Sequence, residues 1–153
     1  MRPTISAAAM VLAMTLVLAA QTLSAQPAAG QACSLLTKED AAAALGEAVQ
    51  GPRSKALPGG PSSCEYSGSG INRVHLNVIP FTAEQAAIYK GMCAQKGKQG
   101  LTGLGDVTCW YNDKHEELQV AKGLTFVSIE LRRSGDPTEP IKAVARKVYD
   151  KLK

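Results

Sequence analysis

Four cysteines constrain this chain more strongly than any other feature of its sequence. They are Cys33, Cys64, Cys93 and Cys109, and all of them follow an N-terminal segment with the pattern of an export signal. An even number of cysteines in an exported chain indicates disulfide bonds. A redox centre or a zinc site is disfavoured, because the chain has no Cys-x-x-Cys motif and its cysteine spacing fits no zinc ribbon or finger.

The N-terminal 25 residues predict a signal peptide. Arg2 supplies the positive charge, residues 7–20 supply the apolar segment, and Leu23-Ser24-Ala25 is a small-residue cleavage site. Cleavage is expected after Ala25. Gln26 follows where a lipoprotein would have cysteine, which argues against lipidation and against a stable membrane anchor. The expected location is the periplasm or the medium.

The rest of the chain predicts a flexible lead-in over residues 26–32 and a single domain over residues 33–153. Its length suits one domain with a modest core. The net charge of +4 is mild for a chain of this size and gives no reason to expect a nucleic-acid partner.

The segment from Cys33 to Gly46 predicts the first helix. The Thr37 side chain can cap the helix, and the Asp40 carboxylate can accept a hydrogen bond from the Thr37 backbone N–H, which completes a capping box. Gly46 can end the helix in a left-handed conformation. A short apolar stripe must then be buried, and a sheet is its expected partner. The stripe consists of Leu35, Leu36, Ala41, Ala44 and Leu45.

The remaining elements follow from alternation and helical spacing. Glycines and prolines predict loop throughout residues 47–63. Thr82 and Gln85 predict a capping box for a second helix, and Thr138 is the expected cap of a third. Strands are expected over 61–67, 73–78 and 107–111, around Leu118 and Val120, and over 127–131.

These elements predict an α+β fold in the order α-β-β-α-β-β-β-α. About five antiparallel strands would pack against two to three helices, which cover one face of the sheet.

The expected elements favour one of the three cysteine pairings. Cys33 with Cys64 would join the first helix to the first strand, and Cys93 with Cys109 would join the second helix to the third strand. The chain-entropy model gives each such bond roughly 3 to 4 kcal/mol. The sequence does not choose among the three pairings, which stay open at this stage.

Three motifs resemble a family of small, uncharacterised exported bacterial proteins, many of them lipoproteins. The motifs are Cys33 to Gly46, Cys64-Glu65-Tyr66 and Gly103-Leu104-Gly105-Asp106. The resemblance covers nearly the whole mature chain and is consistent with pairing of Cys33 with Cys64. It implies no established activity and no catalytic residues, and it implies that Cys93 and Cys109 are an addition to the basic pattern.

No catalytic constellation, cofactor or metal site is expected. His75 stands on a strand between Arg73 and Asn77, where alternation favours a solvent-facing position. His115 lies in a predicted turn, and two histidines on separate hairpins do not indicate a metal site.

Aromatic side chains are the best candidates for a binding surface. We expect Trp110, Tyr66 and Tyr111 to form it, because aromatic rings supply contact area at low entropy cost. Strand alternation places Trp110 and Tyr111 on opposite faces of the sheet, so one of them should point away from the main core.

The sequence therefore favours a non-catalytic envelope protein, a monomer that binds an unknown envelope or extracellular protein through the exposed face of its sheet. One alternative is an inhibitor or immunity-type protein for an envelope hydrolase. Another alternative is a small-ligand binder or an unrecognised enzyme that uses His75.

Overall fold

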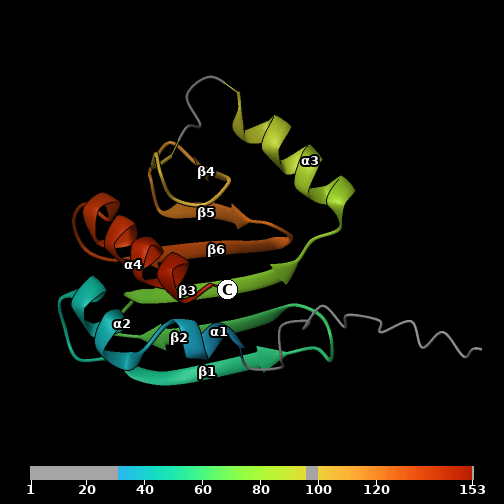
Figure 1. The fold of residues 1–153 in the computed structure, drawn as a ribbon. Helices are drawn as coiled ribbons and strands as arrows, with labels where there is room; N and C mark the ends of the chain where they lie inside the picture. The colour runs from blue at the N-terminus through green and yellow to red at the C-terminus, as the bar shows by residue number, and fades with distance from the viewer. Residues whose placement is uncertain (1–30, 96–99, 153) are drawn as a thin grey trace, which may run out of the picture.

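A computed structural model of the chain describes residues 31–95 and 100–152. Within these residues, one antiparallel sheet of six strands is flanked by four helices, as Figure 1 shows. The α+β class expected from the sequence is confirmed, with one strand more than predicted. The proposed signal peptide and residues 26–30 of the proposed lead-in lie outside the described residues.

The sheet consists of two three-stranded meanders joined through their third strands. Its spatial order is β1-β2-β3-β6-β5-β4, and every neighbouring pair is antiparallel. The strands are β1 (Gln50–Ala56), β2 (Ser62–Ser67), β3 (Arg73–Pro80), β4 (Val107–Trp110), β5 (Glu117–Lys122) and β6 (Thr125–Arg132).

Strand β1 corrects the prediction of a loop throughout residues 47–63. All seven of its residues are exposed, so it carries no apolar alternation that the sequence could reveal. It is an edge strand with no neighbour on its outer side, so the missing N–H of Pro52 can be tolerated there. Its register with β2 shifts between Gln50 and Arg53. Pairing with β2 therefore overrides a composition that favours turns.

The helices are α1 (Gln31–Leu35), α2 (Lys38–Leu45), α3 (Ala83–Cys93) and α4 (Thr138–Lys151). The segment expected to be one helix is thus two, which meet at Leu36 and Thr37. Because α1 begins at Gln31 and buries Ala32, the predicted lead-in is wrong for these two residues.

Two of the three predicted N-terminal helix caps are confirmed, and Gly46 ends α2 in the predicted left-handed conformation. The capping boxes of Thr37 with Asp40 and of Thr82 with Gln85 are both present. The prediction for Thr138 is wrong, because this residue is the first of α4 and its backbone N–H donates to Asp136 at 2.8 Å.

The main core lies between one face of the sheet and helices α1, α2 and α4. The central strands alternate as predicted and send every second side chain into this core. The inward residues of the sheet include Val74, Leu76, Val78, Leu118, Val120, Val127, Ile129 and Leu131.

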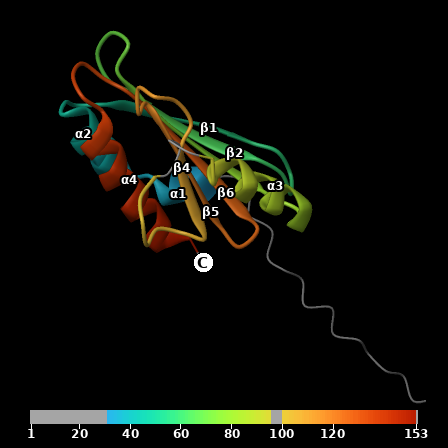
Figure 2. The same cartoon turned by 90° about the horizontal axis from the view of Figure 1, so that it is seen from above.

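Helix α3 lies on the opposite face of the sheet, which corrects the expectation that helices cover one face. Figure 2 shows α3 on one side of the strands and α1, α2 and α4 on the other. A second, smaller core forms beneath α3, where Tyr89 and Cys93 pack against Cys109, Ala121 and Phe126.

Two disulfide bonds join helices to the sheet. Cys33 of α1 pairs with Cys64 of β2, and their Cα atoms are 5.0 Å apart. Cys93 at the end of α3 pairs with Cys109 of β4, with a Cα separation of 5.4 Å. These are the two pairs that the predicted elements favoured, and such bonds are typical of oxidising compartments outside the cytosol. Among the described helices, none is long and apolar enough to cross a membrane.

Candidate binding groove

The three aromatic residues expected to form a binding surface lie in different environments. Tyr66 is 4% exposed, packs in the main core, and donates a hydrogen bond from its hydroxyl to the Leu36 carbonyl at 3.3 Å. Trp110 is 7% exposed, also belongs to the main core, and packs at a tilt of 30° against the ring of His115, with the ring centroids 4.4 Å apart. Tyr111 is 62% exposed. Strand alternation separates Trp110 from Tyr111 as expected, but Tyr66 is a core residue because its side chain faces α1 and α2.

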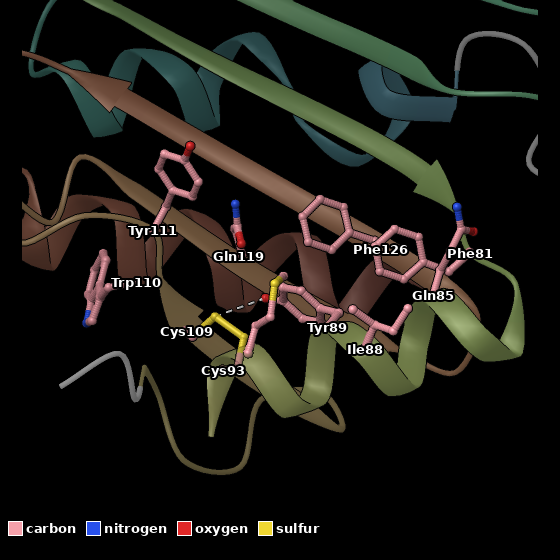
Figure 3. A pocket seen from close by; sticks show the side chains of 11 residues that line it. Phe81, Gln85, Ile88, Tyr89, Cys93, Cys109, Trp110, Tyr111, Gln119 and Phe126 are labelled. Carbon is pink, nitrogen blue, oxygen red and sulfur yellow. Dashed lines mark hydrogen bonds between the residues drawn. A yellow bond between two sulfur atoms is a disulfide. The ribbon is translucent and has the colours of Figure 1, made fainter. Parts of the chain in front are cut away.

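A groove runs between α3 and the face of the sheet that α3 covers. Its volume is about 450 Å³ and it is open to solvent. Figure 3 shows side chains from α3, β4, β5 and β6 around it. Its lining consists of Phe81, Gln85, Ile88, Tyr89, Met92, Cys93, Cys109, Trp110, Tyr111, Gln119 and Phe126.

An aromatic cluster packs the two ends of the segment from Phe81 to Tyr89 against the sheet. Phe81 stacks on Phe126 with ring centroids 4.8 Å apart, and Tyr89 meets Phe126 edge-on at 5.0 Å. Such ring pairs contribute about 0.5–1.5 kcal/mol beyond the area that they bury. The floor of the groove is therefore a packed aromatic surface.

The disulfide between Cys93 and Cys109 fixes the other end of α3. The hydroxyl of Tyr89 lies 3.3 Å from the Cys109 sulfur, so the tyrosine and the disulfide form one wall of the groove. Only Tyr89 and Cys93 of this helix are fully buried. The buried residues of α3 thus lie in its second half, and Gln85, Ile88 and Met92 line the groove beside them.

Three apolar side chains at the rim of the groove are exposed. Tyr111 is joined by Ile88, which is 58% exposed, and by Met92, which is 50% exposed. Ile88 and Met92 are four residues apart and lie on the same side of α3. Exposed apolar side chains gathered at one site are typical of binding surfaces, and methionine adapts well to different partners.

Gln119 brings a polar group into the groove. Figure 3 places its amide between Tyr111 and Phe126. Its Nε2 donates to Glu117 Oε1 at 2.8 Å, and Ser128 Oγ donates to the same oxygen at 2.7 Å. Burial raises the pKa of the Tyr89 phenol, and the charge of Glu117 raises it further. The field of the Glu117 carboxylate therefore reaches the wall of the groove.

The open part of this sheet face is polar, and His75 lies there as expected. The strand register places His75 between Glu65 of β2 and Glu130 of β6. Glu130 accepts hydrogen bonds from Arg73 at 3.0 Å and Arg132 at 2.6 Å. Burial raises the pKa of Glu130, but the two guanidinium groups outweigh it and lower that pKa.

Neither histidine lies in the groove lining. His75 stands on the open face, and His115 Nδ1 is 3.5 Å from the Thr138 hydroxyl beside Trp110. Among the residues that the structure describes, no group of three His, Cys, Asp or Glu side chains is arranged to hold a metal ion.

Sequence reasoning missed Ile88, Met92 and Gln119. The sequence did contain one indication of this surface. In α3, Tyr89 and Cys93 form one apolar pair spaced four residues apart, and Ile88 and Met92 form a second pair beside it. Two such pairs make an apolar face wider than a short helix buries, but only the fold places that face beside Gln119.

Comparisons with protein-family models, with curated proteins and with solved structures find no match for this chain.

Proposed function

We propose that the protein is a non-catalytic binding module that is exported to the periplasm or the medium and holds a segment of a partner protein in the groove beside α3. The observation that carries this proposal is an open apolar groove of about 450 Å³ with exposed Tyr111, Ile88 and Met92 at its rim. Binding sites have volumes of about 300–1,000 Å³ and combine an apolar lining with a few polar groups.

The rim residues have the chemistry of an interaction surface. A tyrosine and a methionine contribute large contact area, and both residue types are enriched at protein interfaces. Gln85 and Gln119 stand at the groove as neutral hydrogen-bonding groups, which suit the backbone amides of an extended segment. The predicted export signal and the two disulfides support a place outside the cytosol.

Selection from a library of short randomised peptides on the purified, oxidised protein tests this proposal. Each enriched peptide is then measured against a double variant, Ile88→Glu with Met92→Glu, which puts charge at the rim. The matched control is Leu57→Glu with Ile71→Glu, because both side chains are exposed and neither lines the groove. Melting temperature and thiol titration confirm that each variant is folded and oxidised.

We expect peptides that bind the wild type and the control but lose at least about tenfold in affinity for the rim variant, since one desolvated charge costs more than about 1.4 kcal/mol. Peptides that bind the rim variant as well as the wild type contradict the proposal, as does a selection without enrichment.

A small apolar ligand is the second candidate occupant, and the volume of the groove favours it. Native mass spectrometry of the protein from its producing cells tests this candidate. A bound small mass that is present on the wild type and lost from the rim variant would support it. The version that uses His75 has less support, because His75 is not in the groove lining.

An inhibitor or immunity-type protein is a narrower form of the first proposal. A segment of an envelope hydrolase, bound in the groove with loss of the hydrolase activity, would support that form.

A further inference from the structure

Glu117 lies directly beside the groove. Its backbone carbonyl accepts the Tyr111 N–H at 3.0 Å, which places the two residues opposite each other on β5 and the chain that continues β4. Opposite side chains on one face have Cβ atoms about 4.5–5.5 Å apart. Glu117 and Gln119 alternate onto the same face, so the carboxylate borders both the exposed rim and the polar group within the groove.

This carboxylate has hydrogen bonds but no cationic partner among the described residues. Both of its donors, Ser128 and Gln119, are neutral and bind the same oxygen, Oε1. The structure gives no ion pair to Glu117 within residues 31–95 and 100–152. Its second oxygen, Oε2, has no hydrogen bond in that part of the chain.

The arginines on the strands of this face have other partners. Arg73 and Arg132 both bind Glu130, the residue opposite Glu117 on β6. Arg53 of β1 lies 4.0 Å from Glu65 of β2, on the same face but towards the other edge of the sheet. The residues that line the groove include no charged side chain. The groove therefore has an apolar floor and, at its edge, a carboxylate without an ion pair among the described residues.

We infer that the groove takes a partner segment in which an apolar side chain, seated on the aromatic floor, stands next to a lysine or arginine that pairs with Glu117. This inference rests on the proposed function and adds the chemistry of the partner. The apolar side chain fills the space between Ile88 and Phe126, and the neighbouring cation reaches Oε2 across Tyr111. Charge complementarity of this kind fixes the orientation of the segment and speeds its association.

The test uses the peptides that depend on the groove in the selection described above. Their affinities are measured for the wild type, for Glu117→Gln and for the matched control Glu65→Gln, which removes a carboxylate from the same face three strands away. Glutamine keeps an oxygen that can accept from Ser128 and Gln119, so the fold is expected to be preserved. Each peptide is also made with its basic residue replaced by glutamine.

We expect the selected peptides to carry lysine or arginine beside an aromatic or aliphatic residue. Glu117→Gln should weaken their binding on the order of 5-fold, whereas Glu65→Gln should change it little. The glutamine peptides should bind the wild type and Glu117→Gln equally. Raising the salt concentration should weaken wild-type binding of the basic peptides only, which checks the charge without any substitution in the protein.

Two outcomes overturn the inference, and they are distinguishable. Groove-dependent peptides without a basic residue, or with equal affinity for Glu117→Gln, overturn the partner chemistry and leave the proposed function standing. A selection with no groove-dependent peptide overturns both.

Discussion

Tyr66 and Tyr111 both lie in or next to strands of the sheet, but we expect Tyr66 to contribute to stability and Tyr111 to contribute to binding. Tyr66 is buried against α1 and α2, where its hydroxyl binds the Leu36 carbonyl. Tyr66→Phe removes that hydrogen bond and leaves a buried carbonyl without this partner. We expect the free energy of unfolding to fall by about 1 kcal/mol, measured by urea denaturation. A change below about 0.5 kcal/mol, the range of ordinary surface substitutions, would contradict this role.

The complementary prediction concerns Tyr111. Because its ring is mostly exposed, Tyr111→Ala should change the free energy of unfolding by less than about 0.5 kcal/mol. The same substitution should weaken groove-dependent peptides on the order of tenfold, since it removes an aromatic group from the rim. Equilibrium unfolding and fluorescence anisotropy measure the two effects. Loss of stability without loss of binding would make Tyr111 a structural residue.

At the scale of elements, Asp40 connects α2 to α4. Its carboxylate accepts hydrogen bonds from Lys147 at 2.6 Å and Lys151 at 3.3 Å, and it completes the Thr37 capping box. Burial raises the pKa of Asp40, but the hydrogen bonds from Lys147, Thr37 and Lys151 together lower it to about 2. The ordinary value for aspartate is about 3.9, so the folded state favours the ionised form.

A pKa that folding lowers stabilises the protein above the unfolded pKa, and this contribution is lost as the pH falls from about 4 towards 2. We expect Asp40→Asn to lower the free energy of unfolding by about 1–2 kcal/mol at pH 7. The gap between the variant and the wild type should narrow at pH 3. Urea denaturation at both pH values measures it, and a gap that is equal at pH 3 and pH 7 would contradict this account of Asp40.

Loss of the disulfide between Cys93 and Cys109 should destabilise α3 locally. The bond from Cys93 to Cys109 closes a loop with a sequence separation of 16 and holds a helix that otherwise rests on a small aromatic cluster. Replacing both cysteines by alanine should raise hydrogen exchange throughout α3 by on the order of 100-fold, the equivalent of about 3 kcal/mol, while the central strands keep their protection. Unchanged exchange in α3 would show that the aromatic cluster alone holds the helix.

Elements with local signals could be predicted from the sequence. Alternation in residues 73–78 and the Thr37 and Thr82 capping boxes identified β3, α2 and α3, because neighbouring residues fix these features. Strand β1 could not be predicted in this way, since all its residues are exposed and only pairing with β2 makes it a strand.

The candidate site depends on long-range placement. Tyr111 was identified because alternation separates it from Trp110. The contribution of Gln119 was missed, because only the pairing of β4 with β5 brings it opposite Cys109. The groove itself arises because α3 lies on the face opposite the other helices, and no local pattern specifies which face a connecting helix covers.

At the scale of the whole molecule, the two faces of the sheet are unequal. Three helices close one face and form the main core, whereas α3 covers only one end of the other face. The remaining part of that face is polar, and the groove lies where the polar surface meets α3. This asymmetry separates stability from binding, so variants at the groove rim should alter partner affinity without unfolding the main core.

Site-specific photo-cross-linking in the cells that produce the protein tests the groove most directly. Benzoylphenylalanine replaces Ile88 at the rim or, as the control, exposed Ile71, which lies outside the groove lining. We predict one discrete protein cross-linked from position 88, with a much lower yield when Tyr111→Ala is added and no cross-link from position 71. The same cross-linked protein from both positions, or a yield from position 88 that Tyr111→Ala leaves unchanged, would contradict the claim that this groove holds the partner.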